Sequence, residues 1–197
     1  MKLGVRLESL GLPFRAGVSA ASRLAVPGIQ FDATGELHPD RLTDTGRRDV
    51  GHLLRSHSLN LTALHCPLRH GLDHPANLDA RLAHLQKALT LSCDLGARIV
   101  IVDAGRIPEK DDDPGMATLR EALIALGNYA DRIGAKLALE SGLDTGERLA
   151  TFLTSLPTVG VGVNYDPGNF LLHGLDPIAQ LAPLKSVIIH EIGRAHL

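Results

Sequence analysis

Aromatic residues are scarce in this sequence of 197 residues, at 3%, and tryptophan is absent. Proteins that bind single-stranded nucleic acids stack the bases on aromatic side chains, so such a binding surface is not expected here. An excess of positive charge is also lacking, since the formal net charge is −2. We therefore predict neither nucleic acid nor an anionic membrane as a partner, because both are attracted by a strongly basic surface.

Cysteine is nearly as rare, and long apolar runs are missing. Cys66 and Cys93 are too few for a disulfide framework, which favours a reducing, cytoplasmic setting. No run reaches transmembrane length. Arg6 and Glu8 interrupt the apolar stretch that a signal peptide would need at the N-terminus. The sequence also lacks a glycine-rich phosphate-binding loop.

Short apolar runs alternate with longer amphipathic segments. Several runs are apolar at consecutive positions, as in Ile99–Val102, which is typical of strands buried on both faces of a parallel sheet. The predicted strands are Leu3–Leu7, Gly28–Asp32, Leu59–His65, Arg98–Asp103, Lys136–Glu140, Val159–Asp166 and Ser186–His190.

The amphipathic segments predict helices. Leu78–Leu95 and Met116–Ile133 carry leucines at spacings of three and four, and Gly96 and Gly134 end them as C-terminal glycines do. Asn77 is a candidate N-cap of the first. The other helices are predicted at Phe14–Leu24, Gly46–Ser56, Thr145–Ser155 and Pro177–Leu181.

The segments that follow the strands are long and rich in glycine, proline and aspartate, whereas the turns from helix to strand are short. The pattern favours α/β architecture, either an open doubly wound sheet or a (β/α)8 barrel. A barrel of eight units takes about 250 residues, so seven strands in 197 residues predict an incomplete one that lacks its last βα unit.

Polar residues end three successive predicted strands. Glu140, Asp166 and His190 would meet at one edge of the sheet, and two carboxylates with an imidazole suit Mn²⁺, Mg²⁺, Co²⁺ or Zn²⁺. Each residue also has a structural interpretation. Glu140 can cap a helix or pair with an arginine, Asp166 can build a turn before Pro167, and His190 can be a hydrogen-bonded core histidine.

Three segments carry a resemblance to a known family. Leu139–Gly142, Asn164–Asn169 and the strand that ends at His190 resemble the xylose isomerase-like TIM barrel superfamily, especially its sugar phosphate isomerase/epimerase branch. The resemblance implies a catalytic divalent metal on Glu140, Asp166 and His190, with Glu140 also acting as acid or base. It implies that the fourth ligand, a second glutamate, lies on an eighth strand that this sequence does not contain.

The resemblance also implies substrate contacts. His65 would face the substrate, although a strand-end histidine held by a backbone carbonyl is an alternative. Asn169 stands where many members have a histidine, and an amide suits substrate better than metal. Arg69 could bind a phosphate or carboxylate, or could be a solvated loop charge. Asp32 and Asp103 also end strands, but they are weaker candidates.

The C-terminal segment departs from the family pattern. We expect a single incomplete barrel domain over residues 1–190, followed by a non-family tail over residues 191–197. The tail resembles translated sequencing-adapter read-through, which suggests a truncated gene record, although a genuine short protein is the alternative. Unpaired edges at the first and seventh strands predict homo-oligomerisation or aggregation.

Three functions remain in order of preference. The first is a metal-dependent sugar or sugar phosphate isomerase or epimerase, which transfers a proton next to a carbonyl and has a small-molecule partner. The second is a non-catalytic sugar-binding or interaction module with a degenerate barrel. The third is a metal-dependent phosphodiesterase or endonuclease of the same superfamily, which the net charge and low aromatic content disfavour.

Overall fold

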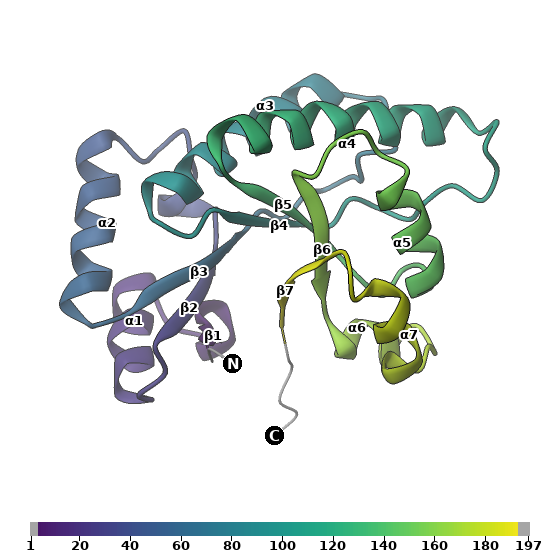
Figure 1. Cartoon of the computed structure of the whole chain (residues 1–197). Helices are drawn as coiled ribbons and strands as arrows, with labels where there is room; N and C mark the ends of the chain where they lie inside the picture. Colours follow the sequence, from purple (N-terminus) through teal and green to yellow (C-terminus); the bar gives the residue numbers. More distant parts are fainter. Residues whose placement is uncertain (1–3, 193–197) are drawn as a thin grey trace.

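The computed structural model describes residues 4–192, which form one curved parallel sheet (Figure 1). Its strands follow chain order: β1 (Gly4–Arg6), β2 (Gly28–Asp32), β3 (Asn60–His65), β4 (Ile99–Val102), β5 (Lys136–Glu140), β6 (Val161–Tyr165) and β7 (Ile188–Glu191). Within the described residues, β1 pairs only with β2 and β7 only with β6. The predicted incomplete barrel of seven parallel strands is therefore confirmed.

Helices lie around the outside of the sheet (Figure 1). They are α1 (Phe14–Arg23), α2 (Asp44–Ser56), α3 (Leu78–Asp94), α4 (Pro114–Ile133), α5 (Gly146–Thr154), α6 (Pro167–Leu172) and α7 (Pro177–Leu184), with 3-10 turns η1 (Leu7–Leu10) and η2 (Gly35–Leu37). The segment after β6 is one of those rich in glycine and proline, but it is not all loop, because it contains α6. Asp166 caps it by accepting the backbone N–H groups of Gly168 and Asn169, and Pro167 fits its first turn.

The helix ends follow local chemistry with one exception. Gly96 and Gly134 adopt positive φ after α3 and α4, as predicted. Asn77 occupies the predicted N-cap position of α3, but it takes a left-handed conformation and its side chain makes no capping hydrogen bond. Asp113 caps α4 by accepting the N–H of Gly115.

The core has two layers of unequal size. A large apolar layer lies between the sheet and the helices and includes Phe31, Leu64, Leu123 and Phe170. The inner, concave side of the sheet buries a much smaller cluster, Ala63, Ile101 and Ala138. Because side chains alternate along a strand, the residues two positions after these three also face the inner side.

Two β-bulges set the register at the carboxyl ends of the strands. Between β2 and β3, Ile29 pairs with Leu61 but Gln30 pairs with Ala63, so Thr62 is the extra residue. Between β6 and β7, Val163 pairs with Ile188 but Asn164 pairs with His190, which leaves Ile189 as the extra residue. Each bulge shifts all the pairs beyond it by one residue.

The ends of the chain bear on two further expectations. Leu3 of the first predicted strand and residues 193–197 of the predicted tail lie outside the described residues, and β7 extends one residue past His190. Across residues 4–192, no helix combines the length and the apolar character needed to cross a bilayer.

Two glycines predict opposite effects of the same substitution. A Cβ at Gly160 would lie 2.1 Å from the carbonyl oxygen of Gly127 in α4, so Gly160→Ala should destabilise the protein by about 1–3 kcal/mol. At Gly17 in α1 the nearest atoms are 3.8 Å away, so Gly17→Ala should stabilise it by up to about 1 kcal/mol. Urea denaturation measures both; equal effects would contradict the close contact at Gly160.

Candidate active site

Glu140, Asn164 and His190 form a row across the ends of three neighbouring strands. Glu140 of β5 pairs with Asn164 of β6, and Asn164 pairs with His190 of β7. Paired residues of parallel strands face the same side of the sheet, and Glu140 lies two residues after Ala138 of the inner cluster. The row therefore lies on the concave side, at the carboxyl edge where barrels of this kind carry their active sites.

The side chain of Asn164 links the two outer members of the row. Its Nδ2 donates to Oε2 of Glu140 at 2.6 Å, and its Oδ1 lies 2.8 Å from Nδ1 of His190. Because a carbonyl oxygen only accepts, Nδ1 of His190 must carry the proton. The other ring nitrogen, Nε2, then keeps its lone pair for a metal or a proton.

Burial also favours a neutral His190 with a lone pair on Nε2. It lowers the pKa of His190, so the ring is neutral near pH 7. Asn164 itself is fully buried, and both ends of its amide are satisfied by the two residues it joins. A buried amide with satisfied partners is rigid, which fixes the spacing of Glu140 and His190.

Asp166 lies two residues beyond Asn164 and is 1% exposed. Its Oδ1 caps α6, and its backbone N–H donates to Oγ of Ser141, which follows Glu140 on the neighbouring chain segment. The structural interpretation of Asp166 as a turn-building residue is therefore correct for this oxygen. A capping carboxylate is held in one orientation, which also suits a metal ligand.

Asn169, in the first turn of α6, brings a second amide to Glu140. Its Nδ2 donates to Oε1 at 3.1 Å, so each carboxylate oxygen accepts one amide N–H. The backbone after Glu140 makes room for this contact, because Gly142 has a φ of +114° and a Cβ there would lie 2.6 Å from Cβ of Asn169. Glu140, Asn164, Asn169 and His190 thus form one hydrogen-bonded network.

A second polar cluster occupies the ends of β1, β2 and β3. The bulge at Thr62 pairs Asp32 with His65, whose Nδ1 lies 2.9 Å from Oδ1 of Asp32. Arg6 donates to both oxygens of the same carboxylate, at 2.9 and 3.2 Å. Burial acts to raise the pKa of Asp32, but the hydrogen bond and charge of His65 and the charge of Arg6 outweigh it and lower this pKa. His65 is therefore held by a carboxylate, not by a backbone carbonyl.

The remaining candidates lie apart from these networks. Arg69 is exposed in the loop after β3, and Asp103 is exposed, with a carboxylate that accepts the N–H of Gly105. Cys66 is fully buried, and burial raises the pKa of its thiol to about 12. A thiol with so high a pKa is a poor nucleophile.

Sequence reasoning missed Asn164 and Arg6 as members of the site. Asn164 stands within a strand beside Tyr165, and its role depends on the register that the bulge creates. Arg6 precedes the end of the first strand, where it appeared only as a break in an apolar run. Both could have been found from the sequence, because each is a polar residue at a position of its strand that faces the inner side of the sheet.

Comparisons with known proteins agree with this architecture. A family model described as a xylose isomerase-like TIM barrel matches residues 18–196. None of the curated proteins matches this chain in sequence. Among solved structures, a xylose isomerase domain protein from Planctomyces limnophilus has a TM-score of 0.82 at 20% identity, over 96% of this chain and 70% of that chain.

Two further structures bear on ligands. D-psicose 3-epimerase, solved in the presence of D-fructose, has a TM-score of 0.81 at 15% identity, over 98% of this chain and 73% of that chain. A xylose isomerase-like TIM barrel protein from Mycobacterium smegmatis, in complex with magnesium, has a TM-score of 0.76 at 16% identity, over 95% and 72% of the two chains. Identities this low show a shared fold and nothing finer.

The second polar cluster predicts a pH-dependent stability. Asp32→Asn removes the charge that pairs with Arg6 and His65 and should lower the free energy of unfolding by about 1–3 kcal/mol at pH 7. Since the folded-state pKa of Asp32 lies below 3.8, its contribution is complete above pH 3.8 and is lost as the pH falls through the folded value. Urea denaturation at pH 7, 5 and 3 measures the difference between the two proteins, with exposed Asp103→Asn as the control. A difference that grows at low pH would contradict the assignment.

Proposed function

Because the chain belongs to the xylose isomerase-like TIM barrel family, we propose that it is a divalent-metal-dependent isomerase or epimerase of a sugar or sugar phosphate. The observation that carries this proposal is the link from Glu140 through Asn164 to His190. It orients one carboxylate at the end of β5 and one metal-competent imidazole nitrogen at the end of β7, on either side of β6.

The donor set fits a divalent ion. Glu140 and Asp166 supply carboxylate oxygens, and the tautomer of His190 that Asn164 selects leaves Nε2 as a nitrogen ligand. Two oxygens and one imidazole suit Mn²⁺, Mg²⁺, Co²⁺ or Zn²⁺. The structural relative in complex with magnesium is consistent with a metal in this fold. When bound, the ion would polarise a sugar carbonyl or hydroxyl group.

The residues of the chain would carry out the proton transfer. Glu140 would take the proton from the carbon next to the carbonyl, and the amide donors Asn164 and Asn169 would hold its carboxylate in place. A base held by two hydrogen bonds keeps its geometry during the reaction, which lowers the reorganisation cost.

Substrate recognition would fall to the residues around this base. Asn169 can bond a sugar hydroxyl, and His65, whose Nδ1 is held by Asp32, has a second ring nitrogen for the same role. Exposed Arg69 would reach a phosphate or another anionic group of the substrate. D-Fructose is the first substrate to test, because the epimerase of similar fold was solved in its presence.

Removing the charge of Glu140 should weaken metal binding at the ends of β5, β6 and β7. We expect this site to bind Mn²⁺ in the wild-type chain and to lose at least tenfold in affinity in Glu140→Gln, because an amide is a weaker ligand and its nitrogen cannot accept an N–H. Isothermal titration calorimetry measures the affinity, and circular dichroism checks the fold. The control is Glu147→Gln, an exposed glutamate of α5.

Asn164→Ala tests the link itself. It leaves every proposed ligand in place but frees the tautomer of His190 and the carboxylate of Glu140. Metal affinity should fall by about 10- to 100-fold, and epimerisation of D-fructose should fall with it. Asn60→Ala, at the exposed start of β3, is the matched control. A well-folded wild-type chain that binds sugar without metal would instead identify a non-catalytic sugar-binding module.

A further inference from the structure

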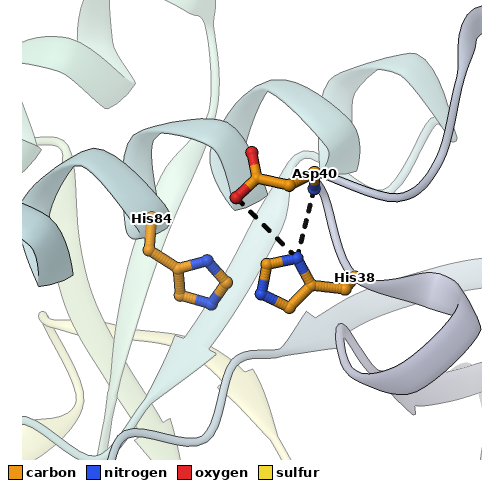
Figure 2. A group of neighbouring side chains, drawn as sticks. All are labelled: His38, Asp40 and His84. Atoms are coloured by element: carbon orange, nitrogen blue, oxygen red, sulfur yellow. Dashed lines mark hydrogen bonds and ion pairs between the residues drawn. The ribbon is translucent and has the colours of Figure 1, made fainter.

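A group of possible metal ligands lies away from the Glu140 network, between the β2–α2 connection and α3. His38 and Asp40 follow η2 in that connection, and His84 lies in the second turn of α3. Figure 2 shows the two imidazole rings side by side, with the carboxylate of Asp40 above them. One ligand atom from each residue lies within 4.8 Å of the other two.

The contacts of His84 and Asp40 leave a donor atom on each. Nε2 of His84 lies 3.1 Å from Sγ of Cys66, so Nδ1 is the ring nitrogen left for a metal. Oδ1 of Asp40 pairs with Nζ of Lys87, and Oδ2 is the oxygen that lies 3.9 Å from Nδ1 of His38. Metal ligands are commonly oriented in this way, through a hydrogen bond on the atom that does not bind.

His38 completes the group. Its Nδ1 accepts the backbone N–H of Asp40 at 3.2 Å, and its ring stacks on that of His84 with centroids 4.7 Å apart and planes at 25°. Nδ1 of His38 therefore carries no proton, and its one lone pair accepts this N–H, so a metal that binds Nδ1 would replace the hydrogen bond.

We propose that His38, Asp40 and His84 bind one divalent transition-metal ion, with Zn²⁺ as the preferred occupant. Two imidazoles and one carboxylate are a borderline-soft set that suits Zn²⁺ and Co²⁺ better than Mg²⁺ or Ca²⁺. All three side chains are partly or fully exposed, so water can complete the coordination.

Binding requires small movements that these positions allow. The three ligand atoms lie within 4.8 Å of one another, and bonds of about 2.0–2.2 Å to one ion draw such atoms together, so the side chains would adjust on binding. Asp40 and Lys87 have side chains that are 50% and 54% exposed, so the ammonium can remain on Oδ1 or move into solvent as the ion binds Oδ2.

The ion would act as a clip. It would tie the connection after β2 to α3, two segments that are otherwise joined here by the exposed Lys87–Asp40 ion pair and the ring stack. Cys66, the partner of His84, directly follows His65 of β3. The clip would therefore stabilise the chain beside the Asp32–His65 pair without contributing a ligand to the Glu140 network.

Titration of Co²⁺ and Zn²⁺ into the Glu140→Gln protein tests this site independently of the proposed function. We expect one equivalent to bind, with visible Co²⁺ absorption and a higher melting temperature. The double variant Glu140→Gln/Asp40→Asn should bind the ion more weakly. Loss of a ligand's hydrogen-bond partner typically costs roughly 10- to 100-fold in metal affinity, and loss of the ligand itself should cost more. Asp40 is half exposed, so this variant should fold even where His84→Gln does not.

The second stacked histidine pair of the chain supplies the control. His70 and His74 stack with centroids 5.3 Å apart, and His70→Gln should leave the bound equivalent and the melting temperature unchanged. Unaltered binding in the Asp40→Asn protein, or equal losses in Asp40→Asn and His70→Gln, would overturn the proposal. If the wild-type chain binds one ion that only Asp40→Asn removes, the clip stands and the metal site at Glu140 does not.

Discussion

The candidate active site depends on the two hydrogen bonds of the Asn164 side-chain amide. It is fully buried, it joins Glu140 to His190, and it selects the tautomer of the histidine. It can do so only because the bulge at Ile189 pairs it with His190. In an unbroken register Asn164 would pair with Ile189, and His190 would pair with Tyr165, which packs in the outer apolar layer. One extra residue in β7 therefore decides which side of the sheet the imidazole faces.

A β-bulge also positions a histidine on the other side of the half-barrel. The bulge at Thr62 pairs His65 with Asp32, which would otherwise lie beside Leu64 of the outer layer. The hydroxyl of Thr62 donates to the carbonyl oxygen of Ile29 and so satisfies an acceptor at the irregularity. Both histidines that the sequence singled out thus reach the concave side through a bulge in the strand pairing.

Local sequence patterns were sufficient for the seven strands and the long helices, and they gave the candidate residues at the strand ends. Consecutive apolar residues identified the strands, leucine spacing identified the long helices, and the strand ends pointed to Glu140, Asp166 and His190. The register was not predictable, because a bulge is a property of two strands and leaves no mark in either alone. The pairing of Asn164 with His190 was missed for that reason. The short helix α6 was missed because Pro167 and Gly168 read as a turn, and only the cap from Asp166 reveals a helix start.

The bulge in β7 also restricts which substitutions position 162 can accept. A Cβ at position 162 would lie 2.8 Å from Cγ2 of Ile189, so the extra residue is accommodated over a bare backbone. A side chain gained at Gly162 would displace Ile189 and, with it, the offset that carries His190. The side chain at position 189 therefore limits which residue can stand at position 162.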